Sequence, residues 1–269
     1  MAFCLAFIYG TAAQAQHLET GITGGGSLYT GDLNPVPQPS LFQPAGGLIV
    51  RYNFTTRWAW KTTLITGRIK GEDLTGEVLS GRSLSFESSL TEFSSHIEFN
   101  FLEYFTGSRR DRFSPYLFGG LGVFFFNPMV NFNGQLVELQ PLHTEGQDTR
   151  DYPDRTPYSR VQFAFPFGMG MKLSLGKKVS IGVEVGYRKT LTDYLDDVST
   201  TYYLEGNTID PAVAAEYLSD QGRNHSAGMQ RGNSRTSDWY AYAGFFLTYK
   251  FNLYKTPPCN DFKNIQRFD

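Results

Sequence analysis

A strict two-residue alternation of side chains between Val161 and Leu175 is the feature that most constrains the fold of this chain. Every odd position in this segment is apolar, whereas the even positions are small or polar. Such a period of two is typical of a β-strand with one apolar face. Strands of soluble proteins average about 5–6 residues, but a strand that crosses a bilayer needs roughly 9–11. The segment therefore predicts a long strand whose apolar face meets lipid.

The same rhythm recurs in seven further segments, so that eight strands are expected in all. These seven are approximately 18–30, 45–54, 58–69, 84–102, 115–127, 179–188 and 238–251. In the segment 84–102, Phe86 and Leu90 are out of phase with Phe93 and Ile97, which predicts a bulge between Leu90 and Phe93. Both faces of 115–127 are apolar, so its register is left open. An even number of strands is what single-chain bacterial barrels require.

The lengths of the connections distinguish a membrane barrel from a soluble one. Short connections follow the second, fourth and sixth strands, and longer ones follow the first, third, fifth and seventh. The short connections are 55–57, 103–114 and 176–178. The long connections are 31–44, 70–83, 128–159 and 194–237. Outer-membrane barrels have tight periplasmic turns and long outer loops. The sequence therefore predicts an eight-stranded antiparallel transmembrane β-barrel over residues 16–251, in a Gram-negative outer membrane, with both termini periplasmic.

Composition agrees with this prediction and excludes other classes. Aromatic residues make up 16% of the chain and glycines number 28, as expected for interfacial girdles and for a wall that bends. No run of 18 apolar residues is present, which excludes a spanning helix. The net charge of -2 gives no reason to expect a nucleic-acid partner.

Both ends of the chain are expected to lie outside the barrel. Residues 1–15 resemble a secretory signal peptide, with Ala13-Gln14-Ala15 as the cleavage pattern. Residues 252–269 are expected to form a periplasmic tail, which carries the single cysteine of the mature chain, Cys259. A lone thiol in an oxidising compartment suggests an intermolecular disulfide with a periplasmic partner, although a free thiol explains it equally well.

Charged residues collect at the inward positions of the predicted strands. The positions expected to form ion pairs inside the barrel are Arg51, Lys61, Glu92, Glu98, Lys172, Glu184 and Arg188. An eight-stranded barrel is only wide enough for its own side chains, so these charges must pair with one another. We expect a salt-bridged plug; the alternative is a path for protons or ions.

Nothing in the sequence indicates catalysis, a cofactor or a small-molecule substrate. Asp220 and His225 lie in one long loop, and His143 and Asp148 in another, but neither pair is near a nucleophile elbow or a zinc motif. The four histidines are scattered singly, so no metal site is expected. The acidic loop that contains Asp193 has the oxygen ligands that Ca²⁺ prefers, but hydrogen bonds within the loop are the favoured role.

Three runs of residues carry a resemblance to a known family. They are Arg188–Ser199, which contains Asp193, Tyr194, Asp196 and Asp197, the run Ser114–Pro128, and the opening Tyr29-Thr30-Gly31-Asp32-Leu33-Asn34. Together they resemble the PorG-like barrels of Bacteroidota, over nearly the whole chain. These are small, non-enzymatic outer-membrane barrels associated with the type IX secretion system. The resemblance implies a structural role, with a periplasmic ring of protein subunits as partner.

Under this interpretation the periplasmic turns and tail make the contacts with the partner. The turn 103–114 carries Arg109, Arg110 and Arg112, and the tail adds Cys259 and Lys263. Such a basic cluster suits an acidic protein surface. Two alternatives are a surface adhesin or receptor that uses its long extracellular loops, and a narrow pore for small solutes.

Overall fold

A computed structural model describes residues 17–73 and 82–251, which form nine strands and short helical turns. The strands are β1 His17–Thr30, β2 Gln43–Asn53, β3 Trp58–Glu72, β4 Ser85–Asn100, β5 Phe113–Phe132, β6 Gln135–Glu138, β7 Val161–Ser174, β8 Val179–Thr190 and β9 Trp239–Phe251. The helical segments are η1 Pro39–Leu41, η2 Gln140–Leu142, η3 Gly206–Thr208 and α1 Ala214–Ser219. No helix among these residues is long and apolar enough to cross a membrane.

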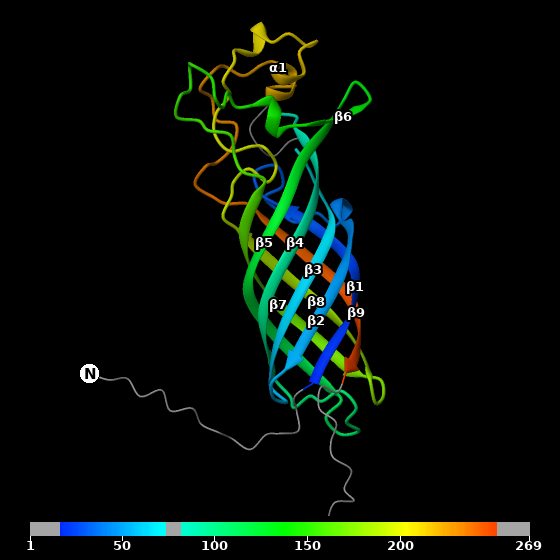
Figure 1. The fold of residues 1–269 in the computed structure, drawn as a ribbon. Helices are drawn as coiled ribbons and strands as arrows, with labels where there is room; N and C mark the ends of the chain where they lie inside the picture. The colour runs from blue at the N-terminus through cyan, green and yellow to red at the C-terminus, as the bar shows by residue number, and fades with distance from the viewer. Residues whose placement is uncertain (1–16, 74–81, 252–269) are drawn as a thin grey trace, which may run out of the picture.

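Eight of the strands close into a barrel (Figure 1). Each strand pairs antiparallel with its neighbour in the order β1, β2, β3, β4, β5, β7, β8, β9, and β9 returns to β1 through a register that runs from Leu18↔Phe251 to Thr30↔Trp239. The short β6 pairs only with the end of β5, as a hairpin that extends beyond the wall. The predicted eight-stranded antiparallel barrel is therefore confirmed.

The bulge predicted in the fourth strand is wrong. β4 pairs without interruption with β3, from Glu72↔Ser85 to Trp58↔Phe99. Phe86 and Leu90 point inward and are 2% and 4% exposed, while Phe93 points outward. The two apolar sets are out of phase because they lie on opposite faces of a regular strand. The inner set, Phe86 and Leu90, packs in the part of the lumen nearest the long loops, called the upper lumen, which is hydrophobic.

The outer surface of the wall is a continuous apolar belt. Large side chains that are more than a third exposed occur on every barrel strand, among them Ile22, Leu48, Leu64, Phe93, Leu121, Phe163, Met169, Val185 and Phe245. Soluble monomers rarely expose contiguous apolar patches larger than a few hundred Å². The closed ladder also leaves no strand edge unpaired, as hydrocarbon surroundings require. The belt is thus suited to lipid.

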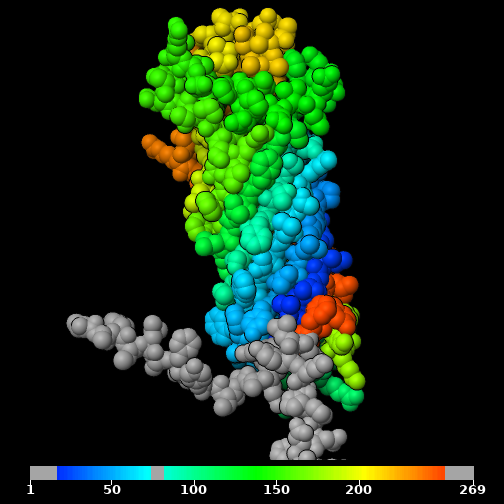
Figure 2. All heavy atoms as spheres, viewed as in Figure 1, coloured from blue at the N-terminus to red at the C-terminus, as the bar shows by residue number. Residues whose placement is uncertain are grey.

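The two ends of the barrel differ (Figures 1 and 2). At one end, called the short-turn end, the strands are joined by residues 54–57, 101–112 and 175–178. At the other, the long-loop end, residues 133–160 and 191–238 fold together into a body wider than the barrel, called the cap. A hydrophobic core runs from the upper lumen into the cap, through Tyr29, Phe86 and Phe126 to Leu195 and Leu218. The outer loops are therefore packed rather than free.

Candidate functional site

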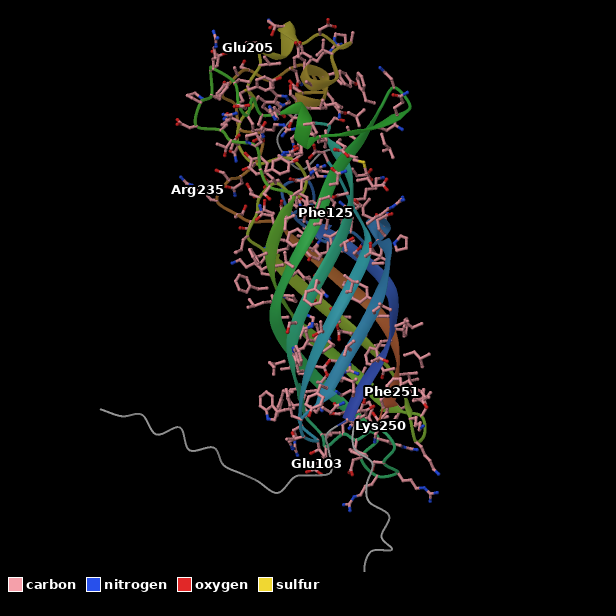
Figure 3. All side chains as sticks on the ribbon, viewed as in Figure 1. Glu103, Phe125, Glu205, Arg235, Lys250 and Phe251 are labelled. Carbon is pink, nitrogen blue, oxygen red and sulfur yellow. The ribbon has the colours of Figure 1, made fainter. Side chains whose placement is uncertain are left out.

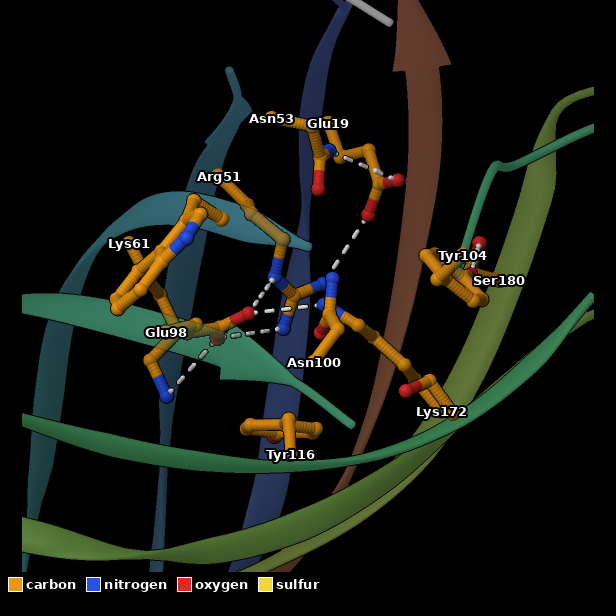
Figure 4. A network of polar contacts seen from close by, with 12 residues as sticks. Glu19, Arg51, Asn53, Lys61, Glu98, Asn100, Tyr104, Tyr116, Lys172 and Ser180 are labelled. Carbon is orange, nitrogen blue, oxygen red and sulfur yellow. Dashed lines mark hydrogen bonds and ion pairs between the residues drawn. The ribbon is translucent and has the colours of Figure 1, made fainter. Parts of the chain in front are cut away.

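The lower half of the lumen holds a buried ion network centred on Arg51 (Figure 4). The Arg51 guanidinium donates to both carboxylate oxygens of Glu98, from Nε at 2.9 Å and from Nη2 at 3.2 Å. Its Nη1 also donates to Glu19 Oε2 at 3.0 Å. The Nζ atoms of Lys61 and Lys172 lie 3.5 and 3.0 Å from the oxygens of Glu98. Three cations from β2, β3 and β7 thus surround one carboxylate from β4.

A third carboxylate makes this network neutral. Glu184 on β8 forms an ion pair with Lys61 and accepts a hydrogen bond from Tyr116 Oη at 2.6 Å. The network then contains Arg51, Lys61 and Lys172 against Glu19, Glu98 and Glu184, and all six side chains are buried. Charges removed from water are tolerated when each is paired and hydrogen-bonded.

A separate pair occupies the lumen nearer the cap. Arg188 Nε donates to Glu92 Oε2 at 3.0 Å, and that carboxylate also accepts hydrogen bonds from Tyr240 and Ser94, both at 2.6 Å. A gap of about 10 Å³ beside this pair is at the lower limit of the volume that one water occupies. The structure therefore places all seven charges predicted to pair in ion pairs, in a lumen filled by side chains.

The motif around Asp196 closes the long-loop end of the barrel. Tyr29, at the top of β1, donates its hydroxyl to Asp196 Oδ2 at 2.5 Å and lies 3.2 Å from Asp238 Oδ1. Asp238 also accepts from the backbone N–H of Leu195 at 2.9 Å, and Asp196 from that of Val198 at 3.0 Å. These bonds fix the start of the last loop across the barrel mouth.

Glu145 joins the two long loops of the cap. Its carboxylate accepts the backbone N–H groups of Ser199 and Thr200, at 2.9 and 3.0 Å, and the Thr200 hydroxyl at 2.6 Å. Arg231 Nη1 donates to it at 3.0 Å, and the Tyr194 hydroxyl lies at 3.2 Å. Glu145 and Arg231 are both almost fully buried. One ion pair thus links the loop after β6 to the loop before β9.

Asp197, another residue of the motif, also binds across the cap. It adopts a left-handed backbone conformation with φ of 67°, and its carboxylate accepts hydrogen bonds from Thr144 at 2.5 Å and Tyr158 at 2.7 Å. No group of three or more His, Cys, Asp or Glu side chains within 17–73 and 82–251 is arranged to hold a metal ion. The geometry assigns Asp196 and Asp197 to loop packing.

Burial raises the pKa values of several acidic groups in the cap. It raises the pKa of the Asp193 carboxyl to about 8. Burial raises the pKa of Asp197 to about 6, although the charge of Arg231 opposes the shift. Burial also raises the pKa of Asp238, and the nearby charges of Asp196 and Asp193 add to this effect. The carboxyl groups of Asp193, Asp196, Asp197 and Asp238 therefore lie together above the barrel mouth, where their ionisation is unfavourable.

Raising the pH from about 5 to about 9 should loosen the cap. In an unfolded chain these carboxyls ionise near pH 3.9. Because folding raises their pKa values, the stability that they contribute is complete below about pH 4 and is lost as the pH passes about 6 for Asp197 and about 8 for Asp193. Hydrogen-exchange protection factors of residues 192–199, normalised to the intrinsic rate at each pH, measure this loss. Asp193→Asn should reduce the change near pH 8; protection that rises with pH would contradict the prediction.

At the short-turn end, residues 101–112 fold into the mouth of the barrel. The Thr106 hydroxyl donates to Glu19 Oε1 at 2.5 Å, and the backbone oxygen of Thr106 accepts Lys250 Nζ at 2.7 Å. Tyr104 donates its hydroxyl to Ser180 at 2.7 Å. Thr106 and Tyr104 are 0% and 1% exposed. The longest turn at this end therefore closes the lumen and connects to the buried ion network through Glu19.

The tip of this turn packs tightly against the turn between β7 and β8. Gly107 has φ of +102°, and a Cβ atom there would lie 2.7 Å from the backbone oxygen of Lys177. Glycine is the residue that tolerates both conditions. Backbone bonds from Phe105 to Asp111 and from Ser174 to Arg112, at 2.8 and 2.7 Å, hold the rest of the turn. The two turns form one rigid surface.

That surface is basic. The three turns of this end contain six cations and two acids; the cations are Arg57, Arg109, Arg110, Arg112, Lys177 and Lys178, and the acids Glu103 and Asp111. All six cations are exposed, and none forms an ion pair with any residue that the structure describes. Glu103 marks this end in Figure 3, opposite Glu205 in the cap. The predicted arginines are thus brought together with two lysines that the sequence did not single out.

Several residues that organise the two ends were not predicted. Glu145, Arg231 and Thr106 lie in loops without periodicity, so no pattern indicated that they are buried. The Asp220 and His225 pair is present, with Nδ1 3.0 Å from Oδ1, but both side chains are buried within the cap. Cys259 and Lys263 lie outside the described residues, as do the predicted signal peptide and tail.

The fold resembles those of outer-membrane β-barrels in solved structures. The attachment invasion locus protein Ail of Yersinia pestis is 11% identical, covering 88% of this chain and 100% of Ail, with a TM-score of 0.43. OprG of Pseudomonas aeruginosa is 13% identical, covering 88% and 98%, with a TM-score of 0.42, and neisserial surface protein A is 8% identical, covering 88% and 97%, with a TM-score of 0.42. No curated protein matches the sequence. Residues 1–203 match the family described as Domain of unknown function (DUF6089), and the chain belongs to that family.

Proposed function

We propose that this protein is a non-enzymatic barrel of the Gram-negative outer membrane that anchors a periplasmic protein assembly through its short-turn end. The observation that carries the proposal is the rigid basic surface formed by the turns 101–112 and 175–178. The apolar belt supports the membrane location, and the filled lumen favours an anchor over a pore. The short turns support a periplasmic location for this end, as in outer-membrane barrels generally.

A preformed surface is an advantage for a structural contact. Arg109, Arg110 and Arg112 lie on a turn whose backbone is fixed by Thr106 and Gly107, so binding does not have to order the loop. Their guanidinium groups are exposed and pair with no carboxylate of the described residues. An acidic partner surface would complement this charge and set the orientation of docking.

The finer assignment is to the type IX secretion system, with its periplasmic ring as the partner. It is supported by the sequence resemblance to PorG-like barrels, above all by the run that includes Asp193, Tyr194, Asp196 and Asp197. In the structure this run joins the cap to the barrel. The disulfide expected at Cys259 would strengthen the same contact and stays a prediction.

A surface receptor is the second candidate, and the folded cap favours it. Residues 133–160 and 191–238 form a packed body with its own ion pair and hydrophobic contacts. Loops that served only as connections would have no need of such order. The two candidates differ in the end of the barrel that binds, so matched substitutions at both ends distinguish them.

Replacing Arg109, Arg110 and Arg112 together by glutamine is expected to lower the recovery of periplasmic partners at least about tenfold. The substitution removes three exposed charges that make no internal ion pair, so the barrel should stay folded. The measurement is quantitative mass spectrometry of a pull-down from solubilised envelope, with a tag after Asp269. Non-reducing gels of the same material test the Cys259 disulfide.

The matched control replaces three exposed arginines of the cap, Arg150, Arg223 and Arg235, by glutamine. This control should leave recovery unchanged if the short-turn end is the binding surface. Loss of partners from the control and not from the short-turn variant would favour the receptor. A barrel that is recovered alone in every case would contradict the anchoring role.

A further inference from the structure

A polar pocket lies beside the seam where the first and last strands of the barrel meet, at the long-loop end. Its volume is about 430 Å³, within the range of roughly 300–1,000 Å³ that is usual for small-molecule sites. The lining residues belong to the top of β1 with the loop after it, to Arg82, and to the end of the loop before β9. They include Thr30, Asp32, Gln230, Asn233, Ser237 and Trp239.

Several of the polar side chains that line the pocket are available to a ligand. Within the described residues, the hydroxyls of Thr30 and Ser237 and the amide of Gln230 make no hydrogen bond. Asp32 uses Oδ2 to accept the backbone N–H of Asn233 at 2.6 Å, and its Oδ1 accepts no hydrogen bond from any residue in 17–73 or 82–251. The pocket therefore presents both hydrogen-bond donors and acceptors.

The charges of the pocket argue against an anionic ligand. Arg82 forms part of the wall, but its guanidinium is neutralised by Asp73 at 2.7 Å and also donates to the backbone oxygens of Asp32 and Arg231. The carboxylate of Asp32 would repel a phosphate or a sulfate. A ligand that donates hydroxyl groups to this carboxylate fits instead.

Apolar surface completes the lining. Trp239 and Pro35 supply it, and Trp239 also contacts the lipid-facing Phe167 edge-on, with ring centroids 6.0 Å apart. Tryptophan at this level belongs to the aromatic belt that marks a membrane interface. A ligand with a hydroxyl-rich edge and an apolar face can use the whole lining.

We propose that this pocket binds a neutral sugar ring, with its hydroxyls on Asp32, Gln230 and Ser237 and its apolar face toward Trp239. The site does not depend on the anchoring role, because it lies at the opposite end of the barrel. Its position at the interface allows two sources of the sugar. One is the saccharide of an outer-leaflet glycolipid, and the other is a soluble glycan outside the cell.

Tryptophan fluorescence offers a direct test. The other two tryptophans, Trp58 and Trp60, lie at the short-turn end, so replacing both by phenylalanine leaves Trp239 as the only indole. The first arm titrates this protein in detergent with glucose, galactose, mannose and N-acetylglucosamine. The second arm compares nanodiscs of phosphatidylethanolamine alone with nanodiscs that also contain lipopolysaccharide. Saturation-transfer NMR on the unsubstituted protein measures the same binding without the tryptophan changes.

The expected result is a saturable change in Trp239 emission that Gln230→Ala with Ser237→Ala weakens about tenfold or more. Gln135→Ala, an exposed amide outside the pocket, should leave it unchanged. A response to free sugars supports a soluble glycan, and a response to lipopolysaccharide alone supports the glycolipid. Absence of any response in both arms and in NMR, or an equal response from the pocket variant, would overturn the proposal.

Discussion

Replacing Arg51 by methionine is expected to lower the free energy of unfolding of the barrel by about 3–5 kcal/mol. Arg51 is 0% exposed and makes three hydrogen bonds with the carboxylates of Glu98 and Glu19. Its loss changes a neutral network of three cations and three carboxylates into one with an excess negative charge. The lumen has no room to hydrate that charge, so its desolvation is left uncompensated.

Urea unfolding of the protein in phospholipid vesicles, followed by tryptophan fluorescence, measures this loss. The chain offers a matched control in Arg68, which pairs with Glu87 at the same 3.0 Å distance but is 65% exposed. Arg68→Met should change the free energy by no more than about 1 kcal/mol, since exposed pairs contribute little. Equal effects of the two substitutions would show that burial does not set the strength of the network.

The wall of the barrel could be predicted because the pattern that defines each strand lies within a short stretch of sequence. In β7, apolar and small residues alternate with the period of the strand, and the predicted segment 161–175 differs from Val161–Ser174 by one residue. The same reasoning placed Arg51, Lys61 and Glu98 inside, since lipid excludes them from the other face. Phe86 and Leu90 led to the wrong prediction of a bulge in β4, because periodicity cannot show that the lumen near the long loops is apolar.

The two ends could not be predicted because their contacts join distant residues. Glu145 and Arg231 are 86 positions apart, and Tyr29 and Asp196 are 167 apart. A loop sequence has no period that reports which side chain is buried. The resemblance carried by the Asp-rich run drew attention to Asp196 and Asp197, but only the structure shows that they hold the cap together. The basic turn was visible in sequence, whereas its rigidity depends on Thr106 and Gly107.

Replacing Arg231 by methionine is expected to open the cap while the barrel stays folded. Arg231 is buried, and its guanidinium donates to Glu145 Oε1 at 3.0 Å and to the backbone oxygens of Asp197 and Ser219 at 2.6 and 3.2 Å. Without it, Glu145 remains as a buried carboxylate that no cation neutralises. The local free energy of opening should fall by about 3–5 kcal/mol, which reduces hydrogen-exchange protection in the cap by at least about a hundredfold.

Hydrogen exchange read by mass spectrometry separates the two parts of the molecule. Peptides from 144–147 and 198–202 should lose protection, whereas those from β7 and β8 should keep it, because these two strands pair with each other from Ala164↔Thr190 to Ser174↔Ser180. Arg235→Met is the control, since Arg235 is exposed in the same loop and its side chain makes no bond with a described residue. Unchanged exchange in the cap of the Arg231 variant would mean that the hydrophobic contacts of Leu195, Val198 and Leu218 hold the loops without the ion pair. Loss of protection in the strands as well would mean that cap and barrel unfold as one unit, and that the cap contributes to the stability of the membrane wall itself.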